Sequence, residues 1–386
     1  MDGTIWLELV IKGFVLCFVL LTGFAYLTLY ERRALARMQV RVGPNRAGPQ
    51  GLLQPIADAV KLIFKEELTP AKVYKVVFVL APILTVVPSL VLAAVIPLGT
   101  SFVLGGRTIT LYVASLNVGV LYLTSIASIA VYGITLAGWS SNNKYAMLGG
   151  IRASAQMISY ELSLGLCFAL AIVLSGLTNP DGGSMNLVDI VNAQKGMWFA
   201  VIQPVGALIF LIVTLAEVNR APFDMPEAEQ ELTAGFHSEY SGMKFALFFM
   251  AEYQKMIVIS MIAATLFFGG YREFWFLKDT FFSVDQNWFL GPIYLMLKVV
   301  VLLFFMIWIR ATWPRIRYDR LMAFGWKVLL PLSLVTVFIT AAGIVLAQEF
   351  NNQVFIYSIP VLSIICAMVA VGLIYRGLRR KSDGRI

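Results

Sequence analysis

Long apolar runs separated by short polar segments dominate the chain. Each run reaches about 20 residues, the length that one helix needs to cross the hydrocarbon core of a bilayer. The runs cover roughly 10–30, 76–98, 116–138, 155–177, 197–217, 243–268, 290–310, 328–347 and 354–375. The pattern predicts an all-α polytopic membrane protein with about nine transmembrane helices.

One further helix is too short to span. Between residues 52 and 66, apolar side chains recur at spacings of three and four: Leu52, Leu53, Ile56, Ala59, Val60, Ile63 and Phe64. This spacing gives an amphipathic helix, which we expect to lie in the plane of the membrane surface with its apolar face inward. It serves either as a collar or as the wall of a lateral opening for a lipid-soluble molecule.

Composition agrees with a membrane protein and excludes several kinds of site. The 386 residues are 59% hydrophobic and 13% charged, against about 25% charged in soluble domains. The three cysteines stand singly in apolar runs, and there is one histidine. No haem, iron–sulfur or zinc site, P-loop or dinucleotide fingerprint is expected. If the chain takes part in redox chemistry, the electrons come from another subunit.

Basic residues are distributed asymmetrically between the two sets of loops. Of 30 Lys and Arg residues, 23 fall in the segments 31–75, 139–153, 218–244, 310–327 and 376–386. Positive charge marks cytoplasmic loops, so the N-terminus is expected outside and the C-terminus in the cytoplasm. The first apolar run is followed by Glu31-Arg-Arg with no small-residue cleavage site, and we interpret it as a retained span rather than a signal peptide.

The stretch 217–240 is acidic where its neighbours are basic. It holds the carboxylates Glu217, Asp224, Glu227, Glu229, Glu231 and Glu239, together with Arg220 and the single histidine, His237. Crowded acids titrate together and can hold protons near neutral pH. The plainer alternative is a solvated acidic loop.

Other ionisable residues fall inside the predicted spans, where an unpaired charge costs about 3 kcal/mol or more. Glu161, Glu217 and Glu252 lie in three different spans, all toward the cytoplasmic half, and could converge on the acidic stretch as a proton path. Glu161 could instead pair with Arg152 or Lys144. Lys255, three residues after Glu252 on the same helix face, could form an internal ion pair with it.

Two loops are strongly basic. Residues 31–46 hold five arginines, and 310–327 holds Arg310, Arg315, Arg317, Arg320 and Lys327. Each loop serves either as headgroup anchoring or as a docking surface for a soluble partner.

Ordered motifs along the chain resemble one known family. They are ERR (31–33), RVGPNR (41–46), LQPIAD (53–58), GWSSNNKY (138–145), RASAQMISYE (152–161), RAPFDMPEAEQEL (220–232) and EYSGMKF (239–245). The chain is similar to the H subunits of the proton-pumping NADH–quinone oxidoreductases, respiratory complex I. The match runs from about Tyr30 to Lys327. Residues 1–353 are expected to form the membrane core, and 354–386 an added C-terminal helix with a basic tail.

The resemblance implies a membrane subunit with no redox cofactor of its own, in a bacterial inner membrane. Such a subunit encloses a quinone chamber with two subunits of the hydrophilic arm. Electrons arrive from an iron–sulfur cluster on one partner, and antiporter-like membrane subunits lie alongside. No nucleic acid is involved.

The resemblance also implies roles for particular residues. Glu31, Arg32, Arg41, Arg46 and Arg220 are expected around the quinone cavity and partner interface, Arg220 as a counter-charge. Six carboxylates are expected to carry protons: Asp224, Glu227 and Glu229 facing the chamber, and Glu217, Glu161 and Glu252 continuing inward. Our hypothesis is that quinone reduction changes their protonation and shifts the Pro222–Pro226 loop between two arrangements.

Two other function classes remain open. A stand-alone ion channel or transporter would act without partners and usually shows internal repeats, which this chain lacks. The membrane anchor of a hydrogenase or of a ferredoxin- or F420-linked oxidoreductase would share the motifs, because the electron donor binds elsewhere. The kind of quinone is left open as well.

Overall fold

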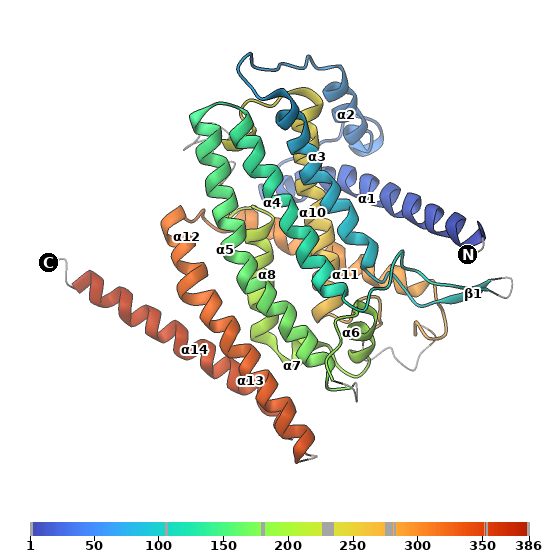
Figure 1. Ribbon diagram of the computed structural model, residues 1–386, viewed down its shortest axis with the longest axis vertical. Coiled ribbons are helices and arrows are strands. Elements are labelled where there is room, and N and C mark those ends of the chain that lie inside the picture. Colours follow the sequence, from blue (N-terminus) through green and yellow to red (C-terminus); the bar gives the residue numbers. More distant parts are fainter. Residues whose placement is uncertain are drawn as a thin grey trace.

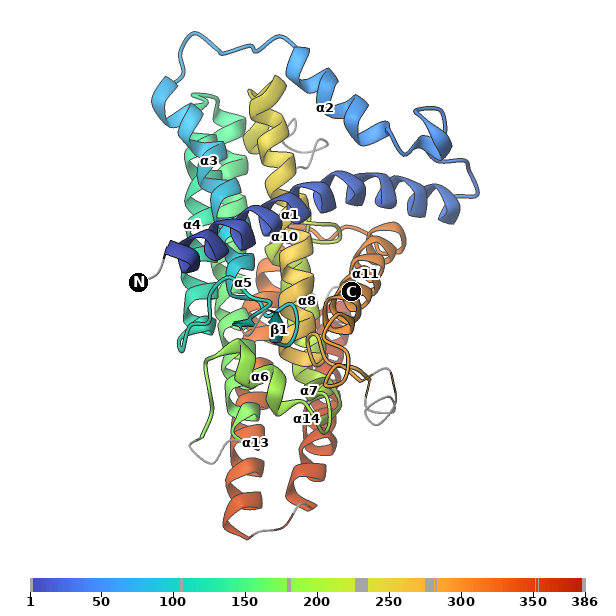
Figure 2. The same ribbon diagram turned by 90° about the vertical axis from the view of Figure 1, so that its right-hand side faces the viewer.

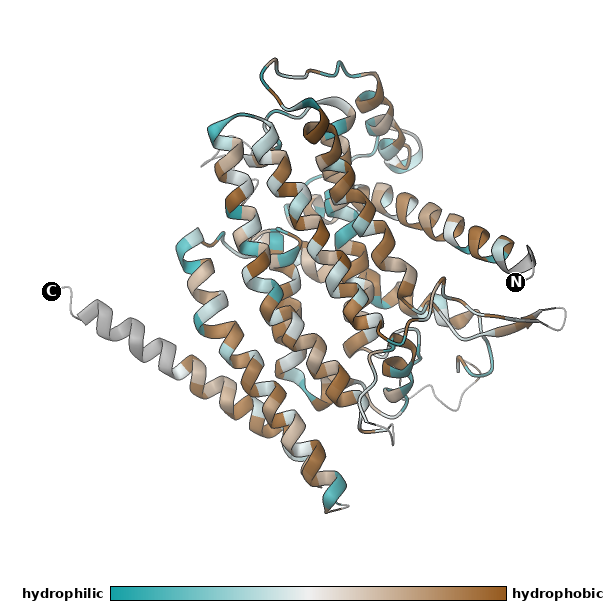
Figure 3. Ribbon diagram, viewed as in Figure 1, coloured by the Kyte–Doolittle hydropathy of each residue, from teal (hydrophilic) through white to brown (hydrophobic). Residues whose placement is uncertain are grey.

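Apolar helices of unequal tilt make up nearly the whole chain. The computed structural model describes residues 3–104, 107–178, 182–225, 235–274, 281, 283–350, 352 and 354–383. Within these, eight helices are long and apolar enough to cross a membrane. The expectation of an all-α polytopic membrane protein is confirmed. Figure 3 shows apolar residues along the long helices and hydrophilic ones gathered at turns such as that between α4 and α5.

The first half of the chain holds the following elements: α1 (Gly3–Met38), the short turn η1 (Pro49–Gly51), α2 (Gln54–Phe64), α3 (Lys75–Val91) with η2 (Leu92–Val95), the hairpin β1 (Phe102–Leu104) and β2 (Arg107–Ile109), α4 (Gly119–Ser140), α5 (Lys144–Ser175) and α6 (Leu187–Ala193). The two strands are antiparallel, with Val103 opposite Thr108.

The second half continues with α7 (Phe199–Ile202), α8 (Pro204–Glu217), the turn η3 (Gly235–His237), α10 (Gly242–Phe267) and α11 (Leu290–Thr312). A composite helix follows, made of α12 (Tyr318–Phe324), the widened turn η5 (Gly325–Leu329) and α13 (Leu330–Glu349). The last helix is α14 (Val354–Asp383).

Helices α3, α4, α5 and α10 run side by side, and α1 crosses them at a steep angle (Figures 1 and 2). Close approach between α4 and its neighbours depends on small residues. A Cβ on Gly133 would lie 2.9 Å from the Ala81 carbonyl oxygen of α3, and one on Gly138 would lie 2.6 Å from that of Ala146 in α5. Small residues at such crossings let backbones pack closely, as is usual between membrane helices.

Helix α1 is longer than the expected span of 10–30. It continues to Met38 because residues 31–38 are mostly strong helix formers, and it ends before Val40, whose φ is 54°. Glu31 and Arg32 therefore lie on a helix and not in a loop. Figure 2 shows α2 beside the end of α1, and the two are joined by a 2.7 Å ion pair between Arg32 and Asp58.

The expectation of one continuous span over 197–217 is wrong. The helix breaks at Gln203, so that α7 and the 14-residue α8 are separate. Gln203 has φ −134° and ψ 74°, and the following Pro204 disfavours the helical conformation of the residue before it. The Gln203 side-chain amide is buried and donates a 2.8 Å hydrogen bond to Thr340 of α13, which satisfies a polar group at the break.

Candidate functional site

The turn after α8 carries the first part of the acidic stretch, and α5 holds it in place. The buried Gln156 side chain donates hydrogen bonds to the backbone oxygens of Ala216 (2.9 Å) and Phe223 (2.8 Å), on either side of the turn. Within the turn, Asn219 has a positive φ of 56° and the Ala221–Pro222 peptide is cis. The Arg220 side chain is buried, with 5% exposed.

The far end of the acidic stretch is anchored to other helices. Glu239 accepts a 2.7 Å hydrogen bond from the side chain of Asn143, the residue that caps α5. Tyr240 stacks on Phe78 with ring centroids 3.9 Å apart and donates to the Phe78 carbonyl at 3.2 Å. Burial raises the pKa of Tyr240 to about 12, so the phenol stays protonated at neutral pH.

Arg220 is the centre of a buried ion-pair cluster. Its Nε lies 2.5 Å from Glu252 of α10, and its Nη1 lies 3.5 Å from Glu31 of α1. The guanidinium stacks over the Tyr253 ring at 4.3 Å. Arg310, near the end of α11, also contacts Glu31. Elements far apart in the sequence thus meet through two arginines and two glutamates. The pairing offsets the cost of removing these charges from water.

A second ion pair lies beside the first on α10. Lys255 Nζ is 2.7 Å from Oε1 of Glu217, whose side chain is 4% exposed. Glu161 of α5 accepts a hydrogen bond from Ser128 of α4 and lies close enough to interact electrostatically with Glu217. Of the three acids predicted to converge, Glu217 and Glu252 are therefore held by neighbouring ion pairs on α10, and Glu161 interacts with Glu217.

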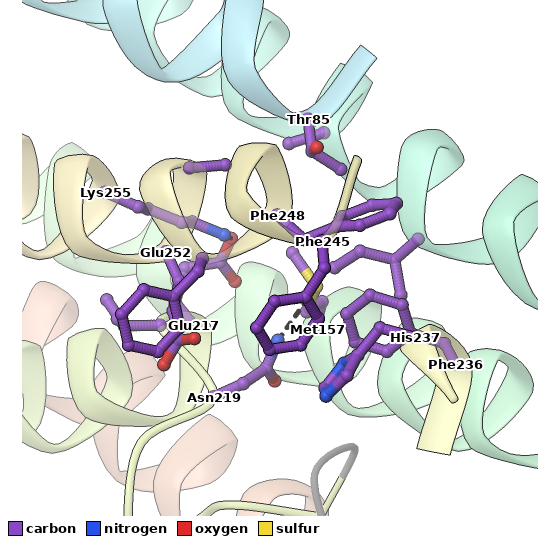
Figure 4. A pocket seen from close by; sticks show the side chains of 15 residues that line it. Thr85, Met157, Glu217, Asn219, Phe236, His237, Phe245, Phe248, Glu252 and Lys255 are labelled. Atoms are coloured by element: carbon purple, nitrogen blue, oxygen red, sulfur yellow. Dashed lines mark hydrogen bonds and ion pairs between the residues drawn. The ribbon is translucent and has the colours of Figure 1, made fainter. Parts of the chain in front are cut away.

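A cavity of ≈ 70 Å³ lies beside these ion pairs. It is large enough for a few water molecules. Glu217, Glu252, Lys255, Asn219 and His237 line it, together with an apolar set that includes Met157, Phe245 and Phe248 (Figure 4). The side chains come from α3, α4, α5, α8, η3 and α10, so the cavity lies inside the helical packing. The site can hold charge and water within an apolar surrounding.

Six predicted site residues remain, of which four are exposed or half-buried and two lie outside the described part of the chain. Asp224 is half-buried at the end of the turn, while Arg32, Arg41 and Arg46 are exposed. Arg41 donates a 2.7 Å hydrogen bond to the side chain of Gln39, two residues before it. Glu227 and Glu229 lie outside the described residues.

Sequence reasoning missed three contributors. The sequence pattern places Arg310 in a basic loop, but the residue lies in the last turn of the apolar helix α11 and contacts Glu31. The sequence suggests Lys255 as a possible ion-pair partner of Glu252 on the same helix face, whereas it binds Glu217. Gln156 carried no charge to attract notice, although a glutamine in an apolar run was a usable signal. No group of His, Cys, Asp or Glu that could hold a metal ion occurs in the part of the chain described.

Comparison with known proteins decides the family. The NADH dehydrogenase family model matches residues 11–341. The chain belongs to this family. One H subunit of the NADH-quinone oxidoreductase of Geobacter metallireducens is 50% identical over 323 residues, which cover 84% of this chain and 92% of that protein. The resemblance seen in the motifs is therefore confirmed.

Other members of the NADH dehydrogenase family are similarly close. An H subunit of the NADH-quinone oxidoreductase of Syntrophobacter fumaroxidans is 48% identical over 344 residues, or 88% of this chain and 96% of the relative. The H subunit from Thermomicrobium roseum is also 48% identical, over 348 residues, which are 87% of this chain and 96% of that protein. The family model ends at residue 341, before α14 begins.

Proposed function

We propose that this chain is the membrane subunit of a proton-translocating NADH–quinone oxidoreductase. It walls the quinone chamber together with subunits of the hydrophilic arm, and it couples quinone reduction to proton transfer. The relatives are named as H subunits of NADH-quinone oxidoreductase, which supports the enzyme class. The finer roles below are argued from the side chains.

One observation carries the coupling role: two ion pairs adjoin, and Glu217, Glu252 and Lys255 of these pairs line one cavity. Arg220–Glu252 and Lys255–Glu217 are one helical turn apart on α10. Charges at this depth are expensive unless they are paired, and such residues usually mark ion or proton pathways. A purely structural ion pair would need neither a second pair nor a water-sized cavity beside it.

The chamber lies at the end of the acidic stretch where the turn after α8 contacts α1, whose end in turn contacts α2. Glu31 and Arg220 form its inner wall, and Arg32, Arg41 and Arg46 lie at its rim toward the partner subunits. Asp224, Glu227 and Glu229 exchange protons with the reacting headgroup. The apolar residues Ile56, Val60 and Ile63 of α2 are exposed, which suits a lateral entrance for a lipid-soluble quinone between α1 and α2.

Proton transfer then follows the acids inward. The quinone accepts electrons from the iron–sulfur cluster of the partner subunit, and its reduction consumes protons. The carboxylates near the headgroup change their protonation state. Arg220 then shifts its ion pairing between Glu31 and Glu252. The change in charge reaches Glu252, then Glu217 and Glu161, and continues toward the antiporter-like membrane subunits.

Topology and the C-terminal segment complete the proposal. The N-terminus lies outside and the C-terminus in the cytoplasm of a bacterial inner membrane, as the distribution of Lys and Arg indicates. Residues 1–353 form the core. The segment 354–386 is a peripheral addition, whose helix α14 packs against α13, α8 and α7.

The test uses membranes from a strain that lacks this chain. NADH oxidation is measured with a quinone acceptor, with and without a quinone-site inhibitor, and again with a water-soluble artificial acceptor. We expect loss of the inhibitor-sensitive quinone reaction while the artificial-acceptor reaction survives. Unchanged quinone reduction would contradict the proposal and favour a hydrogenase-type anchor or a transporter.

A further inference from the structure

Lys255 is a cation on the wall of a cavity whose lining also includes two acids, mostly apolar side chains and the polar Thr85, Asn219 and His237. Its side chain is 12% exposed, and its Nζ lies 2.7 Å from Oε1 of Glu217. A lysine that needed only to reach water could lie at a helix end, since its long stem allows it to extend to the interface. Lys255 lies well inside α10 and is directed at a buried carboxylate.

Glu217 is placed to exchange a proton with the cavity. One of its oxygens is bound by Lys255, and the other, Oε2, is buried with no hydrogen-bond partner in the described protein. Glu217 lines the cavity, whose volume of ≈ 70 Å³ has room for a few waters. A buried carboxylate oxygen requires a donor, and cavity water is the donor that the site can accommodate.

The other ionisable groups around the Lys255–Glu217 pair each contact other residues. Glu252, one turn before Lys255 on α10, is held by Arg220 at 2.5 Å. Glu161 from α5 accepts from Ser128, and His237 from η3 packs between Phe236 and Phe245. Each of the two acids on the cavity wall, Glu252 and Glu217, therefore has its own cation.

We propose that Lys255 gates proton entry at Glu217 and is a positioning residue of the acidic line, the proposed proton path through Glu252, Glu217 and Glu161. The inference rests on the proposed function. While the pair is closed, the ammonium group of Lys255 favours the anionic form of Glu217. Transfer of a proton from a hydronium ion in the cavity to Glu217 breaks one O–H bond of the hydronium, forms one O–H bond on Glu217 and leaves a neutral water. The attraction is thereby removed and the ammonium group is released.

The released ammonium has an alternative carboxylate on its own helix. Glu252 and Lys255 are three residues apart and share a helix face. Movement of Nζ toward Glu252 would compete with Arg220 for that carboxylate. Opening of the Lys255–Glu217 pair is thereby linked to the Arg220 cluster at the chamber wall. The direction of proton transfer depends on whether Lys255 is paired with Glu217 or with Glu252.

The experiment uses the assembled enzyme in native membranes and in proteoliposomes. Lys255→Met, Lys255→Arg, Glu217→Gln and the double variant Lys255→Met/Glu217→Gln are compared. Quinone turnover is normalised to the artificial-acceptor activity, which reports the amount of assembled complex, and proton translocation is measured per electron. The double variant removes both charges, so it leaves no unpaired ion to disturb folding.

We expect Lys255→Met to lower normalised turnover about tenfold, because it leaves a buried charge without its partner. Lys255→Arg should retain most of the turnover. In the Glu217→Gln background, Lys255→Met should cause no further loss, because the lysine acts through Glu217.

Three results would overturn the gate: normal turnover and proton translocation in Lys255→Met, additive losses in the double variant, or equal damage from arginine and methionine. The proposed function has a separate result. Normal turnover and translocation in Glu217→Gln would contradict the acidic line and the gate together, whereas impaired Glu217→Gln with unimpaired Lys255→Met would overturn the gate alone.

Discussion

Arg220 Nε lies 2.5 Å from Glu252 Oε1, and the same guanidinium reaches Glu31 at 3.5 Å. One arginine on the turn after α8 thus ties α10 to α1. Glu31 is 3% exposed and Arg220 5%, so neither charge can be relieved by solvent if the other is lost. The chamber wall and the start of the acidic line depend on the same side chain.

Replacing Arg220 with methionine should therefore damage both folding and function. Removing one partner of a buried pair costs about 3–5 kcal/mol, because Glu252 loses this cation, although Glu31 keeps its contact with Arg310. We expect a lower amount of assembled complex and loss of quinone reduction in what assembles. Complex content is measured by the artificial-acceptor reaction, and quinone turnover by the inhibitor-sensitive rate.

Lys195→Gln provides the control for Arg220→Met. Lys195 is an exposed basic residue on the opposite side of the predicted topology, and its loss should leave both readouts near the wild-type values. Wild-type quinone turnover in Arg220→Met would show that the cluster is not needed by the reaction.

Gln156 should be required for the geometry of the turn. Gln156→Met preserves side-chain length but removes the donors to the Ala216 and Phe223 carbonyls. Both carbonyls keep a backbone donor, from Asn219 and Met225, so each lost hydrogen bond should cost about 0.5–1.5 kcal/mol. We expect a lower unfolding temperature of the purified complex and reduced quinone turnover. Gln286→Met, at an exposed glutamine, is the matched control, and equal behaviour of the two variants would refute the assignment.

The contact between α13 and α14 can be tested at Gly343. A Cβ there would lie 2.6 Å from Ile359 Cγ1 of α14, so Gly343→Ala must displace that side chain. Overpacking of this kind costs about 1–3 kcal/mol. We expect looser association of α14, seen as faster proteolysis after residue 349, with quinone turnover kept.

Gly165→Ala is the control for Gly343→Ala, since a Cβ at Gly165 meets nothing within 4 Å. Loss of quinone turnover in Gly343→Ala, with α14 still protected, would contradict the peripheral role proposed for the C-terminal segment.

Periodicity and composition were enough to predict the fold class and most membrane helices. They also indicated that Glu161, Glu217 and Glu252 belong together, because acids are rare in apolar runs. The partners of these acids could not be predicted. Lys255 and Glu252 share a helix face, yet Lys255 binds Glu217 of α8, because the approach of another helix decides which acid is nearer.

Local backbone choices were equally hidden. The break at Gln203 follows from the proline after it and from a hydrogen bond to Thr340, of which only the proline is visible in the sequence. Arg310 looked like one more loop arginine, because nothing in the sequence shows that α11 ends beside Glu31 of α1.

The most direct test of the central claim is the proton-to-electron ratio of Glu161→Gln in proteoliposomes. Glu161 accepts a hydrogen bond from Ser128, which a glutamine can also accept, so the change removes a titratable group with little effect on packing. We predict loss of proton translocation and of coupled quinone reduction, with artificial-acceptor activity retained. Normal quinone reduction with a normal proton-to-electron ratio would contradict the acidic line.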